Sequence, residues 1–119
     1  MTRVSHMTIS YDAKTFRGVS NSNHGDVSDE TVFEYRQERQ LVSATYRGGS
    51  VVLGQLIAIA SEEGELDVRY HHVNIAGDLM TGICHSVPEV LPNGKIRLHE
   101  TWKWTSGDGS AGESVVEEV

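Results

Sequence analysis

The chain has 119 residues, a length that fits one domain. Its 10 Lys and Arg residues stand against 17 Asp and Glu residues, so the formal net charge is −7. Nucleic acids and anionic membranes attract basic proteins, and this charge therefore excludes both as expected partners. We expect the excess of acidic residues to keep the protein in solution.

Cysteine usage and the first residues of the chain indicate where the protein works. Cys84 is the single cysteine, so no disulfide can form within the chain, which suits a reducing compartment. No apolar run is long enough to cross a bilayer, and the first ten residues lack the apolar segment of a secretory signal. We predict a cytoplasmic protein, in which residues 1–7 are an extension or tag-like segment and residues 8–119 form one domain.

Short runs of β-branched and aromatic residues recur along the chain, and no stretch keeps the apolar spacing of an amphipathic helix. We predict strands over residues 8–11, 16–20, 31–37, 41–46, 51–60, 66–73, 79–87 and 95–105. Turn residues separate them, as at Gly48-Gly49 and at residues 91–94, Leu-Pro-Asn-Gly. Residues 107–112 are flexible by composition. Residues 113–119 are expected to add an edge strand or to fray.

The short loops between these strands predict the topology. Parallel crossovers need a dozen or more residues each, so sequential strands with short connections favour antiparallel neighbours. A twisted sheet of about eight strands tends to curl, and closure removes its unpaired edges. We therefore predict an all-β fold, a single antiparallel up-and-down β-barrel of about eight strands with a lipocalin-like (calycin) architecture. A half-open, sharply curved sheet is the alternative.

Several motif-like groupings lack the context that their chemistry needs. The G-x-G-x-x-G spacing of residues 107–112 opens no helix, which a dinucleotide site requires. His71 and His72 are adjacent on a strand and point to opposite faces, so they cannot share one ion. A site assembled across strands from His72, His85 and Glu100 stays open, although no metal-ligand spacing is present. We predict no catalytic residue, no metal and no cofactor.

The predicted strands 66–73 and 95–105 change along one face from aliphatic residues to aromatic and polar ones. If this face points into the barrel, the interior holds a carboxylate, an imidazole and several rings that form a ligand pocket. The candidate residues are Phe33, Tyr35, Tyr70, His72, Glu100, Trp102 and Trp104. A buried carboxylate is costly unless it is paired, and the candidate partners of Glu100 are His72, Arg17 and Arg69. The alternative is a filled core, which is usual in small barrels.

Four stretches of the chain resemble a family of short bacterial proteins, namely FRGVSNSNHGDVSDETVFEYRQE, ATYRGGSVVLGQLI, LDVRYHH and LPNGKIRLHETWKWTSGDGS. The resemblance covers nearly the whole chain from about Thr8. Members of this family are commonly labelled N-acetylglutamate synthase, so the resemblance implies acetyl transfer from acetyl-CoA to glutamate. The chain has no Arg/Gln-x-x-Gly-x-Gly/Ala loop of the kind that binds acetyl-CoA, and no catalytic residue carries over.

Taken together, the residues favour a non-enzymatic barrel that binds a small molecule in its interior, akin in architecture only to lipocalin or avidin-like folds. Two alternatives stay open. One is an enzyme, including the N-acetylglutamate synthase that the resemblance implies. The other is a β-rich interaction module whose edge or outer face meets a protein partner, which includes a homo-oligomer.

Overall fold

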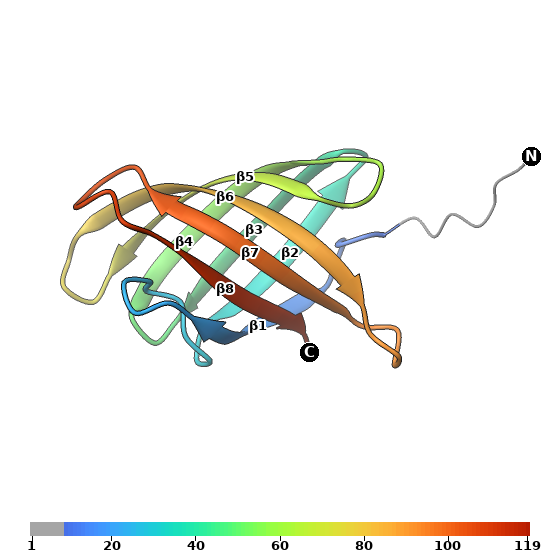
Figure 1. Ribbon diagram of the computed structural model, residues 1–119, viewed down its shortest axis with the longest axis horizontal. Helices are drawn as coiled ribbons and strands as arrows, with labels where there is room; N and C mark the ends of the chain where they lie inside the picture. The colour runs from blue at the N-terminus through green and yellow to red at the C-terminus, as the bar shows by residue number, and fades with distance from the viewer. Residues whose placement is uncertain (1–8) are drawn as a thin grey trace, which may run out of the picture.

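A computed structural model describes residues 9–119, and the predicted extension over residues 1–7 lies outside this part of the chain. Each strand of the described chain pairs antiparallel with the next, and the last pairs with the first, so that the sheet closes into a barrel (Figure 1). The predicted all-β, up-and-down barrel is confirmed. Its strands are β1 (Thr15–Asn21), β2 (Val32–Glu38), β3 (Leu41–Gly48), β4 (Val51–Ala60), β5 (Leu66–Asn74), β6 (Leu79–Val90), β7 (Ile96–Trp104) and β8 (Ala111–Glu118).

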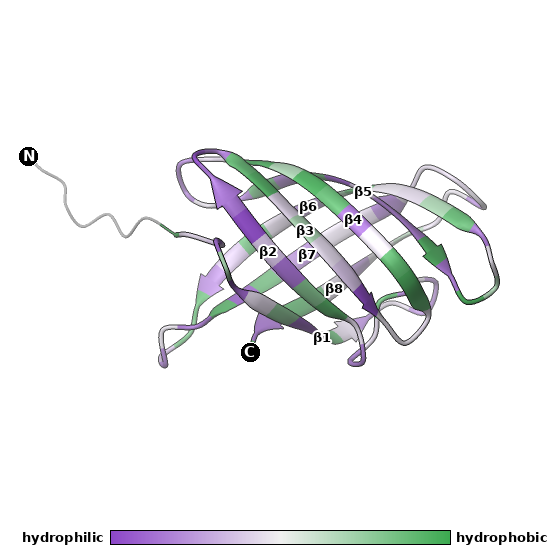
Figure 2. Ribbon diagram, turned by 180° about the vertical axis from the view of Figure 1, so that it is seen from behind, coloured by the Kyte–Doolittle hydropathy of each residue, from purple (hydrophilic) through white to green (hydrophobic). Residues whose placement is uncertain are grey.

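The side chains alternate between the inside and the outside of the barrel, as the period of two predicts. On β7, the inward-facing residues are Ile96, Leu98, Glu100, Trp102 and Trp104, and the residues that alternate with them face outward. β4 is hydrophobic along most of its length (Figure 2). Its buried and its exposed positions both carry apolar residues. Among residues 9–119, no helix combines the length and the hydrophobicity that a membrane crossing requires.

The first predicted strand, residues 8–11, is wrong for its described part, because residues 9–11 form no strand. They lie instead against one end of the barrel. Tyr11 is fully buried, and its hydroxyl donates a hydrogen bond to the Gly64 carbonyl at 2.6 Å. A turn at Ala13, with φ of 58°, then leads the chain into β1. Tyr11 therefore closes this end of the barrel as a plug.

The C-terminal segment is also different from the expectation of an edge strand or a frayed tail. β8 lies between β7 and β1, and its register pairs Val116 with Leu98 on one side and with Gly18 on the other. Val116 is fully buried. The barrel closes only because this segment supplies its eighth strand, so both rows of backbone hydrogen-bonding groups on β8 are paired.

The antiparallel order places alternate connections at opposite ends of the barrel (Figure 1). The β2–β3, β4–β5 and β6–β7 turns share one end with Tyr11, which we call the plugged end. The loop between β1 and β2, residues 22–31, shares the other end with the β3–β4, β5–β6 and β7–β8 turns. We call these residues the mouth loop and this end the mouth.

Candidate ligand cavity

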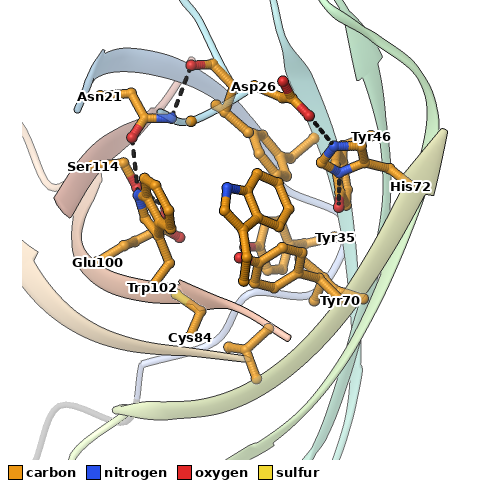
Figure 3. A pocket seen from close by; sticks show the side chains of 16 residues that line it. Asn21, Asp26, Tyr35, Tyr46, Tyr70, His72, Cys84, Glu100, Trp102 and Ser114 are labelled. Atoms are coloured by element: carbon orange, nitrogen blue, oxygen red, sulfur yellow. Dashed lines mark hydrogen bonds and ion pairs between the residues drawn. The ribbon is translucent and has the colours of Figure 1, made fainter. Parts of the chain in front are cut away.

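A cavity of about 50 Å³ lies inside the barrel near the mouth (Figure 3). All seven candidate residues line it: Phe33, Tyr35, Tyr70, His72, Glu100, Trp102 and Trp104. The structure thus brings the predicted face together at one place. Its lining also includes residues that the sequence did not nominate, among them Asn21, Asp26, Tyr46, Cys84 and Ser114. The volume is enough for one or two water molecules, so the closed cavity is small.

The space exists because three aromatic rings lie along the barrel wall. In the strand register, Tyr46 pairs with Gly54, Tyr70 with Gly82, and Trp102 with Gly112. A Cβ atom added at each of these glycines would collide with the ring of the paired aromatic residue. Because glycine has no side chain, each ring can lie over it instead of pointing across the barrel. Glycines within strands were the sequence signal for this arrangement.

Glu100 is the carboxylate of the cavity. Its Oε1 accepts a hydrogen bond from the Ser114 hydroxyl at 2.8 Å, and its Oε2 accepts one from the Ser86 hydroxyl at 3.3 Å. Ser86 is fully buried and Ser114 nearly so. Burial raises the pKa of Glu100 to about 7, although the two serine hydrogen bonds act in the opposite direction. Near neutral pH, Glu100 therefore exists in both protonation states.

None of the three predicted partners of Glu100 contacts it. Arg17 is exposed on the outside of β1. Arg69 is also outside, where its Nη1 lies 2.7 Å from Asp67. His72 does point inward, but it bonds to other groups. The prediction of a charged partner is wrong: the serine hydroxyls on the two strands beside β7 supply the hydrogen bonds to Glu100 instead.

His72 links the barrel wall to the mouth loop. It is 2% exposed, and its two ring nitrogens each lie 2.9 Å from an oxygen, Nδ1 from the Tyr46 hydroxyl and Nε2 from Asp26 Oδ2. The Asp26 carboxylate can only accept, so Nε2 carries a proton. In the neutral imidazole, the Tyr46 hydroxyl then donates to Nδ1. Asp26 and Tyr46 hold His72 in one orientation, and Asp26 ties the loop down.

Both tryptophans donate hydrogen bonds that help to hold the mouth loop over the cavity, one directly and one through Asn21 of β1. Trp104 Nε1 donates to the His24 carbonyl at 3.1 Å, and Trp102 Nε1 donates to Asn21 Oδ1 at 2.9 Å. The Asn21 amide in turn donates to the Val27 carbonyl at 3.0 Å (Figure 3). The polar edges of both tryptophans are therefore satisfied by residues of β1 and the loop.

Other candidates from the sequence do not join the cavity as a reactive site. His85 lies on the outer face, where its Nε2 is 2.9 Å from Glu65, so His72, His85 and Glu100 are not brought together. Within residues 9–119, no group of three or more metal-ligating side chains is found. Cys84 lines the cavity, and burial raises the pKa of its thiol, which keeps it protonated. Cys84 therefore acts as a neutral wall residue.

The avidin-like protein family matches residues 9–119, nearly the whole chain. The chain belongs to this family, whose barrel agrees with the closed antiparallel sheet described above. The affiliation is thus avidin-like and not specifically lipocalin-like. Searches of the curated proteins and of the solved structures each found no match.

Proposed function

We propose that the protein binds a small molecule in the cavity at the mouth of the barrel and does not act on it as an enzyme. The observation that carries this proposal is the aromatic wall around a carboxylate, an imidazole and several hydroxyls, held open by glycines. A few convergent polar groups in an apolar wall are typical of ligand sites. Membership of the avidin-like family adds support, since such barrels suggest binding of a biotin-like small molecule.

Binding on this proposal includes opening of the mouth loop. Ligand pockets commonly enclose ~300–1,000 Å³, whereas the closed cavity has about 50 Å³. Asn21, Asp26 and Val27 form part of its lining, so movement of the loop and its β1 junction enlarges the space. It also frees the hydrogen-bonding groups of Trp102 and Trp104 for a ligand.

Tryptophan fluorescence tests this proposal directly. Trp102 and Trp104 are the two tryptophans of the chain, and both line the cavity. We expect 2-imidazolidinone, which is the uncharged headgroup analogue of biotin, or a small amine to change the emission. The variant Gly82→Leu, whose side chain would displace the Tyr70 ring into the cavity, should abolish that change. Glu34→Gln, on the outside of β2, is the matched surface control and should respond like the parent protein. An unchanged spectrum with every probe contradicts the proposal.

We also propose self-association through the outer face of β3 and β4. Ile57 is 61% exposed and Ile59 55%, and Leu41 lies beside Ile59 in the register. The neighbouring Asp67 and Arg69 on β5 supply charges of both signs. We call Leu41, Ile57 and Ile59 the apolar stripe. A two-fold axis through the stripe would pack it against the same stripe of a second copy, which is the geometry of an isologous dimer.

Sedimentation velocity over a range of protein concentrations tests the dimer. Ile57→Lys should shift the protein to the monomer, because it places a charge in the centre of the apolar stripe. Gln55→Lys is the control. Gln55 lies two residues before Ile57 on the same outer face of β4, and we expect its substitution to weaken the dimer less. A parent protein that stays monomeric at all concentrations contradicts this proposal.

The acetyl transfer implied by the resemblance described above stays a prediction. Incubation of the protein with acetyl-CoA and glutamate, with detection of released CoA thiol, tests it. Turnover that Glu100→Gln abolishes would replace the binding proposal by an enzymatic one.

A further inference from the structure

The Glu100 carboxylate has unused capacity on the cavity side. An ionised carboxylate offers about four lone-pair sites, and the structure gives Glu100 two side-chain hydrogen bonds, from Ser86 and Ser114. Both donors belong to strands that flank β7, so they approach from the wall of the barrel. A ligand that enters the cavity can therefore supply further donors or a positive charge to the same carboxylate.

Aromatic rings surround the same space at angles to one another. The rings of Tyr70 and Trp104 have centroids 5.7 Å apart and cross at 63°, and those of Trp102 and Trp104 are 5.6 Å apart at 56°. All three rings line the cavity together with Glu100, and we call the part of the cavity that they border the aromatic corner. The face of an aromatic ring attracts cations, most strongly for tryptophan.

The charges around the mouth favour the same kind of ligand. No Lys or Arg is found among the described residues that line the cavity, and its imidazole, His72, is bonded to Asp26. The depression outside the mouth is lined by Asp26, Asp78 and Asp108, again without Lys or Arg. Together with the net charge of −7, this acidic rim attracts cations and repels anions.

We propose that the ligand of this cavity is a small organic cation, whose charged nitrogen lies between the Glu100 carboxylate and the rings of Trp102 and Trp104. This inference rests on the proposed function, because it names the ligand class of the same site. The nitrogen occupies the aromatic corner, and its N–H groups donate to the free lone pairs of Glu100. An alkyl group of the ligand lies against Tyr70.

The protonation of Glu100 gives this proposal a characteristic pH dependence. With its pKa at about 7, Glu100 is mostly protonated at pH 6 and mostly ionised at pH 8. The cation binds the ionised form, so its affinity should rise roughly tenfold over this range. The titratable groups that face Glu100 from other strands of the barrel are Tyr35, Tyr46, Tyr70 and Cys84, whose raised pKa values keep them neutral. Across the cavity lie His72 and Asp26.

An NMR titration with tert-butylamine and its uncharged isostere tert-butanol separates charge from shape. An alkylammonium has a pKa near ~10, as lysine does, so the amine stays protonated from pH 6 to pH 8. The indole N–H signals of Trp102 and Trp104 report binding, since both are hydrogen-bonded to residues that cover the cavity. At pH 8 we expect the amine to bind at least tenfold more tightly than the alcohol.

The variant Glu100→Gln assigns this preference to the carboxylate. It should lose the preference for the amine and the pH dependence, while the weak binding of tert-butanol is retained. Glu34→Gln is the matched control and should keep both. If Glu100→Gln does not fold, the pH series on the parent protein decides, because an affinity for the amine that is flat from pH 6 to pH 8 overturns the proposal.

The outcomes separate this inference from the function on which it rests. If the amine and the alcohol bind equally, or if 2-imidazolidinone binds and the amine does not, the proposal of a cationic ligand is overturned. The proposal of a small-molecule site then still holds. Binding of none of the probes, with the indole signals unchanged throughout, overturns both proposals. A preference for the amine that Glu100→Gln does not alter also overturns the assignment, because the charge would then be recognised elsewhere.

Discussion

The two ends of the barrel interior are built from the same strands but differ in chemistry. At the plugged end, Phe16, Leu66 and Leu98 are fully buried, and Tyr11 closes the space with one hydroxyl hydrogen bond to Gly64. At the mouth, charged and polar side chains lie among the aromatic rings, and a loop covers them through several hydrogen bonds. The plugged end is a packed core, and the mouth end keeps a cavity.

This contrast shows how one small barrel can separate stability from binding. Aliphatic packing gains free energy from every buried group and leaves no space for a ligand. The mouth end gives up part of that gain, because glycines replace side chains and Glu100 is taken out of water. We therefore expect substitutions at the plugged end to change stability and substitutions at the mouth to change binding and dynamics.

The largest effect should come from the plugged end. Leu98→Ala leaves a hole in the packed core and should lower the free energy of unfolding by ~2–5 kcal/mol. Leu79→Ala, on a side chain that is 66% exposed, is the matched control and should change it by less than ~0.5 kcal/mol. Denaturant unfolding measures both. If both substitutions lowered the free energy of unfolding equally, Leu98 would not belong to a packed core.

The pH dependence of stability should come from the mouth. Burial raises the pKa of Glu100 from 4.5 to about 7, so between these values the folded protein binds a proton that the unfolded chain releases. The resulting stabilisation is complete at low pH and is lost as the pH rises through about 7. The loss amounts to up to ~3 kcal/mol. In thermal unfolding from pH 5 to pH 8, Glu100→Gln should flatten this slope and Glu34→Gln should not.

A side chain added at a glycine under a wall ring tests how the mouth end is built. Gly82→Ala places a methyl group against the Tyr70 ring, which must turn into the cavity, at a cost of ~1–3 kcal/mol. The double variant Gly82→Ala with Tyr70→Ala removes the collision. We therefore expect unfolding measurements to give a non-additive pair, in which the glycine substitution is nearly neutral once the ring is absent. Simple additivity would mean that the ring does not depend on Gly82.

The smallest effect concerns the mouth loop. Asp26→Ala removes the acceptor of the His72 Nε2–H, which should weaken closure of the loop by ~1–2 kcal/mol. Hydrogen exchange of amides in residues 22–31 should accelerate, while exchange at the plugged end stays unchanged. Asp29→Ala, in the same loop and exposed, is the control. Equal acceleration in both variants would contradict a specific role of Asp26.

Part of the site could be predicted because strands repeat every two residues. The spacing of Tyr70 and His72 on one strand, and of Glu100, Trp102 and Trp104 on another, places each set on one face whatever the register. The partners of Glu100 could not be found in this way. Ser86 and Ser114 come from the two strands beside β7, and their approach depends on register and on closure of the sheet.

The all-β class, most strand positions and the side chains that share the inner face can be read from the chain, because they follow from local alternation and turn residues. Which segment closes the barrel depends on contacts between residues that are distant in the chain. Residues 9–11 and 111–118 both carry apolar residues next to turns, yet Tyr11 became a plug and β8 became the eighth strand. The same holds for the covering of the cavity by residues 22–31, because their partners on β5 and β7 are far away in the chain.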